Sequence, residues 1–101
     1  GHKFMLTIER IREAVTKVGK KYGIKNAYLF GSYARGEATE SSDVDIIIER
    51  GDIKNYNAFA DFRYDLENEL GTEDIDILTM DGVKPRFYEL IKKDQVALYG
   101  R

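Results

Sequence analysis

The sequence predicts an α/β (α+β) protein in which a small mixed sheet of about three to four strands is covered by helices. Three observations lead to this prediction. Apolar residues recur at helical spacing near the N-terminus, an isoleucine-rich run lies in the middle of the chain, and further short apolar runs alternate with helical segments. The 101 residues are expected to form a single domain, 1–101, because a chain this long buries about two-thirds of the surface that its unfolded form exposes.

The beginning of the chain is expected to hold one helix and one strand. From Thr7 to Tyr22, apolar side chains recur every three or four residues, which predicts an amphipathic helix. Thr7 can cap the start of this helix, and Gly23 can adopt the left-handed conformation that ends it. Residues 27–30 form a short apolar run followed by glycine, which is typical of a buried strand.

The middle of the chain predicts a second strand and a second helix. The run from Val44 to Glu49 is β-branched almost throughout, which favours a strand, and its isoleucines indicate a central position in the sheet. Residues 55–70 place apolar side chains along one stripe, as an amphipathic helix does, and Gly71 can close that helix.

A third strand and a last helix complete the expected fold. The third strand is predicted for residues 75–80. Pro85, the only proline, suits the first turn of a helix, and Phe87 and Leu90 continue that helix. Residues 96–99 form a short apolar tail that is expected to pack back on the core.

The composition excludes several kinds of functional site. The chain has no cysteine, which excludes a disulfide scaffold and a thiolate zinc site. Its single histidine, His2, follows Gly1 in what has the look of a cloning scar, so a Ser-His-Asp triad and a histidine metal site are excluded too. A net charge of −2 gives no basis for direct nucleic-acid binding, and no apolar run approaches a membrane span. We expect a cytoplasmic protein that uses carboxylates, hydroxyls, lysines and arginines.

Two aspartates head the isoleucine-rich strand. Residues two apart in a strand point to the same face, so Asp43 and Asp45 are expected to be neighbours in space. Two ionised carboxylates this close repel each other unless a cation lies between them. Because oxygen ligands suit hard cations, this pair predicts a site for magnesium or manganese.

The third strand repeats the same arrangement with Asp74 and Asp76. If the two strands are neighbours, a third carboxylate converges on the first pair. We favour Asp76 because isoleucines flank it, whereas Asp74 can instead be a turn residue. Three carboxylates are what two metal ions need when they bind the attacking and leaving oxygens of a phosphoryl transfer.

The loop before these aspartates offers groups that bind phosphate. Gly31 lets the backbone approach a phosphate closely, and Ser32 contributes a hydroxyl and an amide at the start of a polar turn. Arg35 adds a cation within reach of the same loop. The alternatives are that Ser32 is only a turn or cap residue, and that Arg35 forms a surface ion pair with Glu37.

The order of these residues resembles a known family. Gly-Ser, ten residues and then Asp-x-Asp resembles the signature of the polymerase-β-like nucleotidyltransferases. The wider string FGSYARGEATESSDVDI resembles the minimal nucleotidyltransferases (MNT) of bacteria and archaea. These are small antidote proteins that are often encoded beside a HEPN-domain ribonuclease toxin.

The resemblance implies the nucleotidyltransferase fold and a role for each motif residue. Gly31 and Ser32 would hold the triphosphate of ATP. Asp43 and Asp45 would ligate two Mg²⁺ ions, with Mn²⁺ as an alternative, and Asp76 would complete the metal site and help to deprotonate the acceptor hydroxyl.

The resemblance also implies a partner and a reaction. Family members of this size lack a separate substrate domain, so the acceptor would be a tyrosine of a HEPN toxin, which receives AMP in a type VII-like toxin–antitoxin pair. Transfer to a small alcohol such as an aminoglycoside hydroxyl, and an antidote that acts only sterically, are the alternatives. A homodimer and a hetero-oligomer are both left open.

Overall fold

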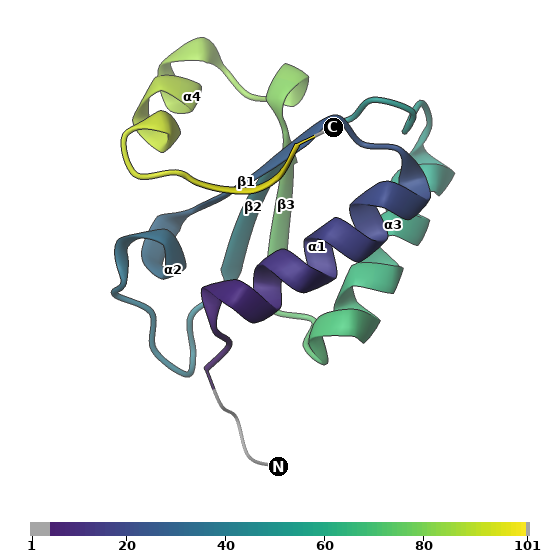
Figure 1. Ribbon diagram of the computed structural model, residues 1–101. Coiled ribbons are helices and arrows are strands. Elements are labelled where there is room, and N and C mark those ends of the chain that lie inside the picture. The colour runs from purple at the N-terminus through teal and green to yellow at the C-terminus, as the bar shows by residue number, and fades with distance from the viewer. Residues whose placement is uncertain (1–4, 101) are drawn as a thin grey trace.

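A four-stranded mixed sheet forms the centre of the protein in the computed structural model, which describes residues 5–100 (Figure 1). The strand order is β3-β2-β1-β4. Strand β1 runs antiparallel to both β2 and β4, whereas β3 is parallel to β2. The strands are β1 Asn26–Phe30, β2 Val44–Glu49, β3 Ile75–Thr79 and β4 Val96–Gly100. This confirms the predicted fold class, including the central position of β2. The interpretation of Gly1 and His2 lies outside the described residues.

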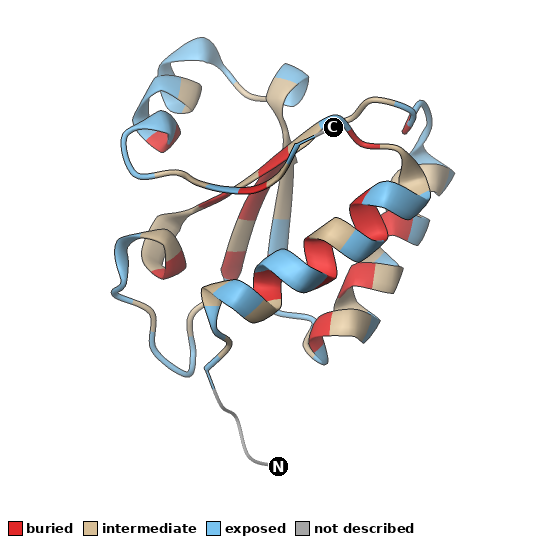
Figure 2. Ribbon diagram, in the orientation of Figure 1, coloured by how far each residue is buried: buried red, intermediate tan, exposed pale blue. Residues whose placement is uncertain are grey.

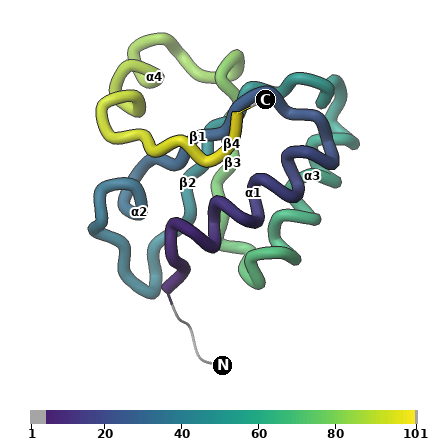
Figure 3. The backbone as a smooth tube through the Cα atoms, viewed as in Figure 1, coloured from purple at the N-terminus to yellow at the C-terminus, as the bar shows by residue number. Residues whose placement is uncertain are grey.

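Helices cover both sides of this sheet. Figures 1 and 3 show α1 and α3 on one side and the shorter α2 and α4 on the other. The helices are α1 Ile8–Tyr22, α2 Gly31–Arg35, α3 Tyr56–Leu70 and α4 Pro85–Lys92, and a short 3-10 helix, η1 Met80–Gly82, follows β3. Within residues 5–100, none of the helices has the length and apolar character that crossing a membrane requires.

The two long helices have the capping residues that their sequences predict or offer. The Thr7 side chain accepts a hydrogen bond from the Arg10 amide at 3.0 Å, and Gly23 ends α1 with φ +71°. Asn55 caps α3 in the same way, accepting from the Ala58 amide at 2.8 Å. The second helix therefore starts one residue later than predicted, because its first polar residue is the cap and not part of the helix.

The main core lies between the sheet and the pair α1 and α3. Val44, Ile46 and Ile48 of β2 are fully or almost fully buried in this core, and Figure 2 shows buried residues recurring along both helices. Because successive side chains of a strand point to opposite faces, Asp45 and Ile47 point to the other side, where α2 and α4 lie. The strand thus directs a carboxylate away from the core.

Three parts of the chain differ from their predicted conformation. The expected polar turn is the helix α2. This helix begins at Gly31 and is followed by Gly36, and both glycines are left-handed, with φ +73° and +74°. The tail at residues 96–99 packs on the core as expected, with Leu98 buried, but it does so as strand β4, which adds to the sheet beside β1. Met80 begins η1 and does not extend β3. All three segments are short, so neighbouring structure determines their conformation more than their own sequence does.

Candidate active site

Carboxylates from two neighbouring strands meet at one end of the sheet. Asp45 of β2 and Asp76 of β3 are direct Cα partners in the parallel pairing of these strands. Asp43 lies one residue before β2. On the other side of β2, Phe30 is the β1 partner of Asp45, so that Gly31 follows immediately beside it. The register therefore places Asp76 on one side of Asp45 and Gly31 on the other, with Asp43 two residues before Asp45.

Asp45 is the carboxylate of this group whose pKa is raised by its surroundings. Partial burial, the charges of Asp76 and Asp43 and a hydrogen bond to Asp76 raise the pKa of the Asp45 carboxyl from 3.8 to about 6, and Arg35 opposes this shift. Removing a carboxylate from water and placing it beside like charges both disfavour its ionised form. A cation at this position would relieve the repulsion.

The carboxylate oxygens are suitable ligands for a divalent metal, although the side chains are not grouped around a common ion position. Within residues 5–100, no three acidic, histidine or cysteine side chains lie close enough together to hold an ion as they stand. Asp43 and Asp76 are exposed, so their side chains are free to turn toward an ion beside the half-buried Asp45. The oxygen-only donor set is the one that hard cations prefer.

Gly31 is in direct contact with Asp45. The glycine has φ +73°, and a Cβ built on it would collide with the Asp45 carboxylate. Residues with a side chain rarely adopt this backbone conformation, and there is no room for one here. Gly31 is thus required for two reasons, and it brings the backbone at the start of α2 against the carboxylate group.

Ser32 and Arg35 extend the site along α2. Phe30 occupies the cap position of α2, and no side chain caps the helix, so Ser32 is not used as its cap. The Arg35 Nε donates to Glu37 at 3.2 Å, which confirms the surface ion pair that was one of the two interpretations. Arg35 also favours the ionised form of Asp45, so its charge reaches the carboxylates as well.

Asp74 lies outside this group. It precedes β3, its side chain is exposed, and its backbone carbonyl accepts a hydrogen bond from the Val44 amide at 2.9 Å. Its own amide donates to the Thr72 hydroxyl at 3.1 Å, as in a turn. These contacts agree with a turn residue, and Asp76 is the residue of this pair that pairs with Asp45.

A cavity beside Gly31, with α4 along one side, is a feature of the site that the sequence did not predict. Phe30, Gly31 and Arg35 face α4 across a cavity of about 260 Å³, which Phe87 and Leu90 also line. The helical spacing of Phe87 and Leu90 signals an apolar face, but spacing alone does not show whether such a face is covered. Their exposed fractions are 43% and 57%.

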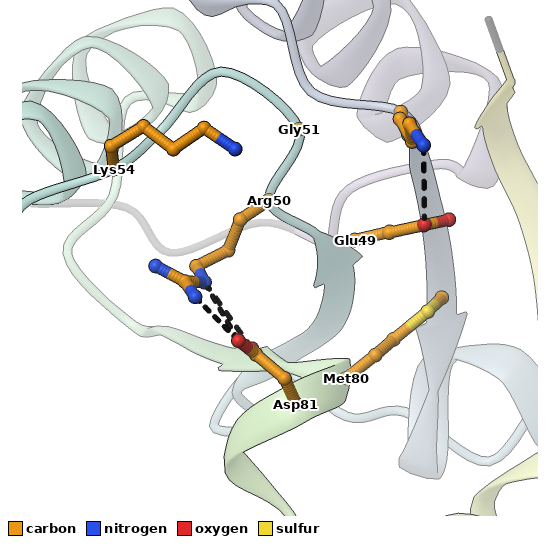
Figure 4. A pocket seen from close by; sticks show the side chains of 7 residues that line it. Glu49, Arg50, Gly51, Lys54, Met80 and Asp81 are labelled. Atoms are coloured by element: carbon orange, nitrogen blue, oxygen red, sulfur yellow. Dashed lines mark hydrogen bonds and ion pairs between the residues drawn. The ribbon is translucent and has the colours of Figure 1, made fainter.

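A second cavity, of about 570 Å³, lies at the opposite end of the sheet (Figure 4). Glu49 and Arg50 line it, and Glu49 lies roughly 13 Å along β2 from Asp45. Figure 4 shows the Arg50 side chain turned to Asp81, to which its Nε donates at 3.1 Å. None of the predicted site residues lines this cavity, and we assign it no part in the chemistry.

Replacing Asp45 by asparagine should stabilise the metal-free protein, and more so as the pH rises. The pKa of Asp45 is higher in the folded chain, about 6, than its ordinary 3.8, so between these values the folded state holds more protons and unfolding becomes easier as the pH rises. The asparagine side chain never ionises. The advantage of Asp45→Asn should therefore be absent near pH 4 and reach about 1–2 kcal/mol near pH 7, allowing for partial solvent screening.

Urea unfolding of both chains in EDTA, at several pH values, measures this difference. Ionisable groups that the two chains share cancel in the comparison. Asp74→Asn is the matched control, because Asp74 is exposed and outside the group, and it should show no such pH dependence. An advantage of Asp45→Asn that is equal at pH 4 and pH 7 would contradict the assignment of the raised pKa to Asp45.

The mixed sheet, with Asp45 paired to Asp76 and in contact with Gly31, agrees with the expected class of protein, a nucleotidyltransferase of the polymerase-β type. The family model described as "Polymerase beta, Nucleotidyltransferase" matches residues 13–101. The chain belongs to this family.

Two curated relatives are similar over nearly the whole chain. A protein of Methanocaldococcus jannaschii, provisionally named a protein adenylyltransferase, is 36% identical over 91 residues, which cover 90% of this chain and 97% of the relative. The "Protein adenylyltransferase MntA" of Thermococcus cleftensis is 31% identical over 96 residues, which cover 91% of this chain and 96% of the relative.

Solved structures show the same fold. One that is provisionally described as a minimal nucleotidyltransferase superposes with a TM-score of 0.77 at 31% identity, over 90% of this chain and 95% of that one. A chain from the complex of a tri-AMPylated HEPN toxin of Shewanella oneidensis with its MNT antitoxin superposes with a TM-score of 0.69, over 94% of this chain and 74% of that one. The second match, at 18% identity, supports the fold alone.

Proposed function

We propose that this chain, acting as a single nucleotidyltransferase domain, is a cytoplasmic antitoxin of a type VII-like HEPN/MNT pair. It transfers AMP from ATP to a tyrosine hydroxyl of its HEPN ribonuclease toxin. The observation that carries the proposal is the pairing of Asp45 with Asp76 directly beside Gly31. The name of the Thermococcus relative supports it, and the fold is shared with a chain from a complex of a HEPN toxin with its MNT antitoxin.

Gly31, Ser32 and Arg35 are proposed to bind the triphosphate. The backbone can approach a phosphate closely only where no side chain intervenes, and Gly31 meets this condition at the start of α2. The Ser32 hydroxyl can donate to a phosphate oxygen. The exposed Arg35 guanidinium can exchange Glu37 for phosphate, because a surface ion pair contributes only about 0–1 kcal/mol.

Asp43, Asp45 and Asp76 are proposed to hold divalent cations, two Mg²⁺ ions or else Mn²⁺. Such ions, when bound, stabilise the charge on the transferring phosphoryl group and align the attacking and leaving oxygens. The contribution of the chain is the clustered negative charge that attracts them. Asp45 holds a fixed position on the central strand, and the exposed Asp43 and Asp76 adjust around it.

The reaction exchanges one bond at the α-phosphorus for another. The acceptor oxygen forms a bond to the α-phosphorus, the bond from that phosphorus to the oxygen bridging to the β-phosphate breaks, and pyrophosphate leaves with the bonding electrons. The hydroxyl proton must go to a base, and we propose Asp76 for this role because it is exposed on the edge strand β3, where an acceptor can reach it. Positioned carboxylates of this kind contribute about 10²- to 10⁴-fold to a rate.

The acceptor is proposed to arrive on another protein. The cavity beside Gly31, about 260 Å³, is smaller than the roughly 300–1,000 Å³ of sites that enclose a whole small molecule. This disfavours an aminoglycoside-sized acceptor held beside ATP. A docked partner can supply the positioning that phosphoryl-type transfer mainly needs.

The test compares ATP with an analogue that binds but cannot transfer AMP. The HEPN toxin is incubated with this chain, magnesium and either ATP or α,β-methylene-ATP, whose α–β bridge cannot be cleaved. With ATP, intact-mass spectrometry should show one or more added AMP groups on the toxin, located on tyrosine, together with loss of ribonuclease activity. With the analogue, the mass should not change. Equal silencing of the toxin in both mixtures, without a mass change, would support the steric alternative instead.

A further inference from the structure

The cavity between β1 and α4 opens directly beside the proposed phosphate site. Gly31 and Arg35, which are proposed to bind the triphosphate, line it together with Phe30 from β1 and α2, and Phe87 and Leu90 line it from α4. The rings of Phe30 and Phe87 meet edge to face, with centroids 6.5 Å apart. In this arrangement the Phe30 ring leaves one face of the Phe87 ring uncovered.

The apolar wall is exposed to solvent although it belongs to a packed helix. Within α4, Ile91 is 6% exposed and holds the helix on the sheet, whereas Phe87 is 43% exposed and Leu90 57%. Exposed apolar side chains around a concave site, with a few polar groups at its rim, are typical of ligand pockets. Arg35 and Asp94 are the charged residues that line this one.

The size of the cavity suits one ring system and not a whole nucleotide. Its volume of about 260 Å³ lies below that of sites which enclose a complete ligand. A nucleotide whose phosphates lie over Gly31 would therefore place only its base here, against the ring of Phe87 and the side chain of Leu90. Asp94 supplies a carboxylate that can accept a hydrogen bond from the N–H groups of a base.

We propose that this cavity is the nucleobase site of the enzyme, with Phe87 as the stacking surface and Leu90 beside it on the same face of α4. The inference rests on the proposed function, because it takes the triphosphate to lie at Gly31. Binding through stacking tolerates every base, since each base has a π-face. Phe87 thus acts on nucleotide affinity, whereas Asp45 and Asp76 act on transfer.

The test separates the base from the phosphates by using a ligand that has none. Calorimetric titration with Mg-ATP and with Mg-tripolyphosphate is compared between the parent, Phe87→Ala, Leu90→Ala and Phe87→Tyr. Phe87→Ala should weaken ATP binding roughly 5- to 150-fold, which corresponds to the about 1–3 kcal/mol of base stacking, and should leave tripolyphosphate binding unchanged. Leu90→Ala should have a smaller effect in the same direction. Phe87→Tyr, which retains the ring, should bind ATP as the parent does.

Tyr64→Ala is the matched control, because Tyr64 is an aromatic residue 63% exposed on α3, on the other side of the sheet. It should change neither affinity. A parent that binds both ligands while Phe87→Ala binds ATP undiminished would overturn this inference alone. So would a Phe87→Ala protein that keeps its ATP affinity but no longer binds the toxin, since the cavity would then be a docking surface for the partner. A parent that binds neither ligand would contradict the proposed function as well.

Discussion

Replacing Asp76 by asparagine is expected to stop AMP transfer while the complex with the partner persists. Asparagine has nearly the same size as aspartate, but it neither accepts the hydroxyl proton nor adds negative charge to the cluster. The rate should fall about 10²- to 10⁴-fold, as expected for the loss of a positioned general base. Asp76 is exposed on the edge strand β3, so the change should leave the fold intact.

The measurement combines a transfer rate with a binding constant. AMP incorporation is followed by intact mass over time, and toxin affinity is measured for each variant without ATP. Asp74→Asn is the control, since Asp74 lies two residues earlier in the same segment and outside the carboxylate group. It should keep its rate within about threefold, as surface substitutions do. Transfer that survives in Asp76→Asn, or is lost equally in Asp74→Asn, would refute the assignment of Asp76.

The second large effect is expected from a single methyl group at Gly31. Gly31→Ala and Gly36→Ala place alanine at nearly the same backbone angle, with φ +73° and +74°, so both should lose about 1–2 kcal/mol of stability. A Cβ at Gly36 meets nothing within 4 Å, whereas one at Gly31 collides with Asp45. Gly31→Ala should therefore lose about 1–3 kcal/mol more, as overpacked sites do, and its ATP affinity should fall.

Urea unfolding of the two alanine variants tests this difference, and a double-mutant cycle tests its cause. Asp45→Ala removes the oxygens that the new methyl group would meet, so the additional loss from Gly31→Ala should largely vanish in that background. Two alanine variants of equal stability would show that Asp45 can move aside. In that event the contact between the glycine and the carboxylate would carry no part of the site.

The regular elements were predictable because each carries its own local signal. Strand β2 was predicted with both of its ends, since β-branched residues fill Val44–Glu49 and polar residues flank it. The two long helices combine an apolar stripe with a capping residue. The spacing of Asp43 and Asp45 predicted that these two carboxylates lie near each other, and the charge of Asp43 contributes to the raised pKa of Asp45.

Other features depend on contacts between distant residues. The pairing of Asp45 with Asp76 requires that β3 lie parallel to β2, which depends on the path of the chain through α3. Strand β4 was expected only as an apolar tail, because its strand conformation depends on pairing with β1, which is far away in the sequence. The pKa of Asp45 reflects burial and two neighbouring charges, which no local pattern contains. The exposure of Phe87 could not be predicted from the sequence either, because the apolar face of a helix is usually covered by other parts of the protein.

The two left-handed glycines that bound α2 have a consequence for how such sequences can diverge. Each residue of a helix turns by about 100°, so one inserted residue between Gly31 and Gly36 would rotate Arg35 away from Ser32. The segment 37–42 carries no helix or strand, and most of its side chains are exposed. Insertions and deletions should therefore accumulate in 37–42 and be excluded from 31–36. The length of the helix is under tighter constraint than most of its side chains.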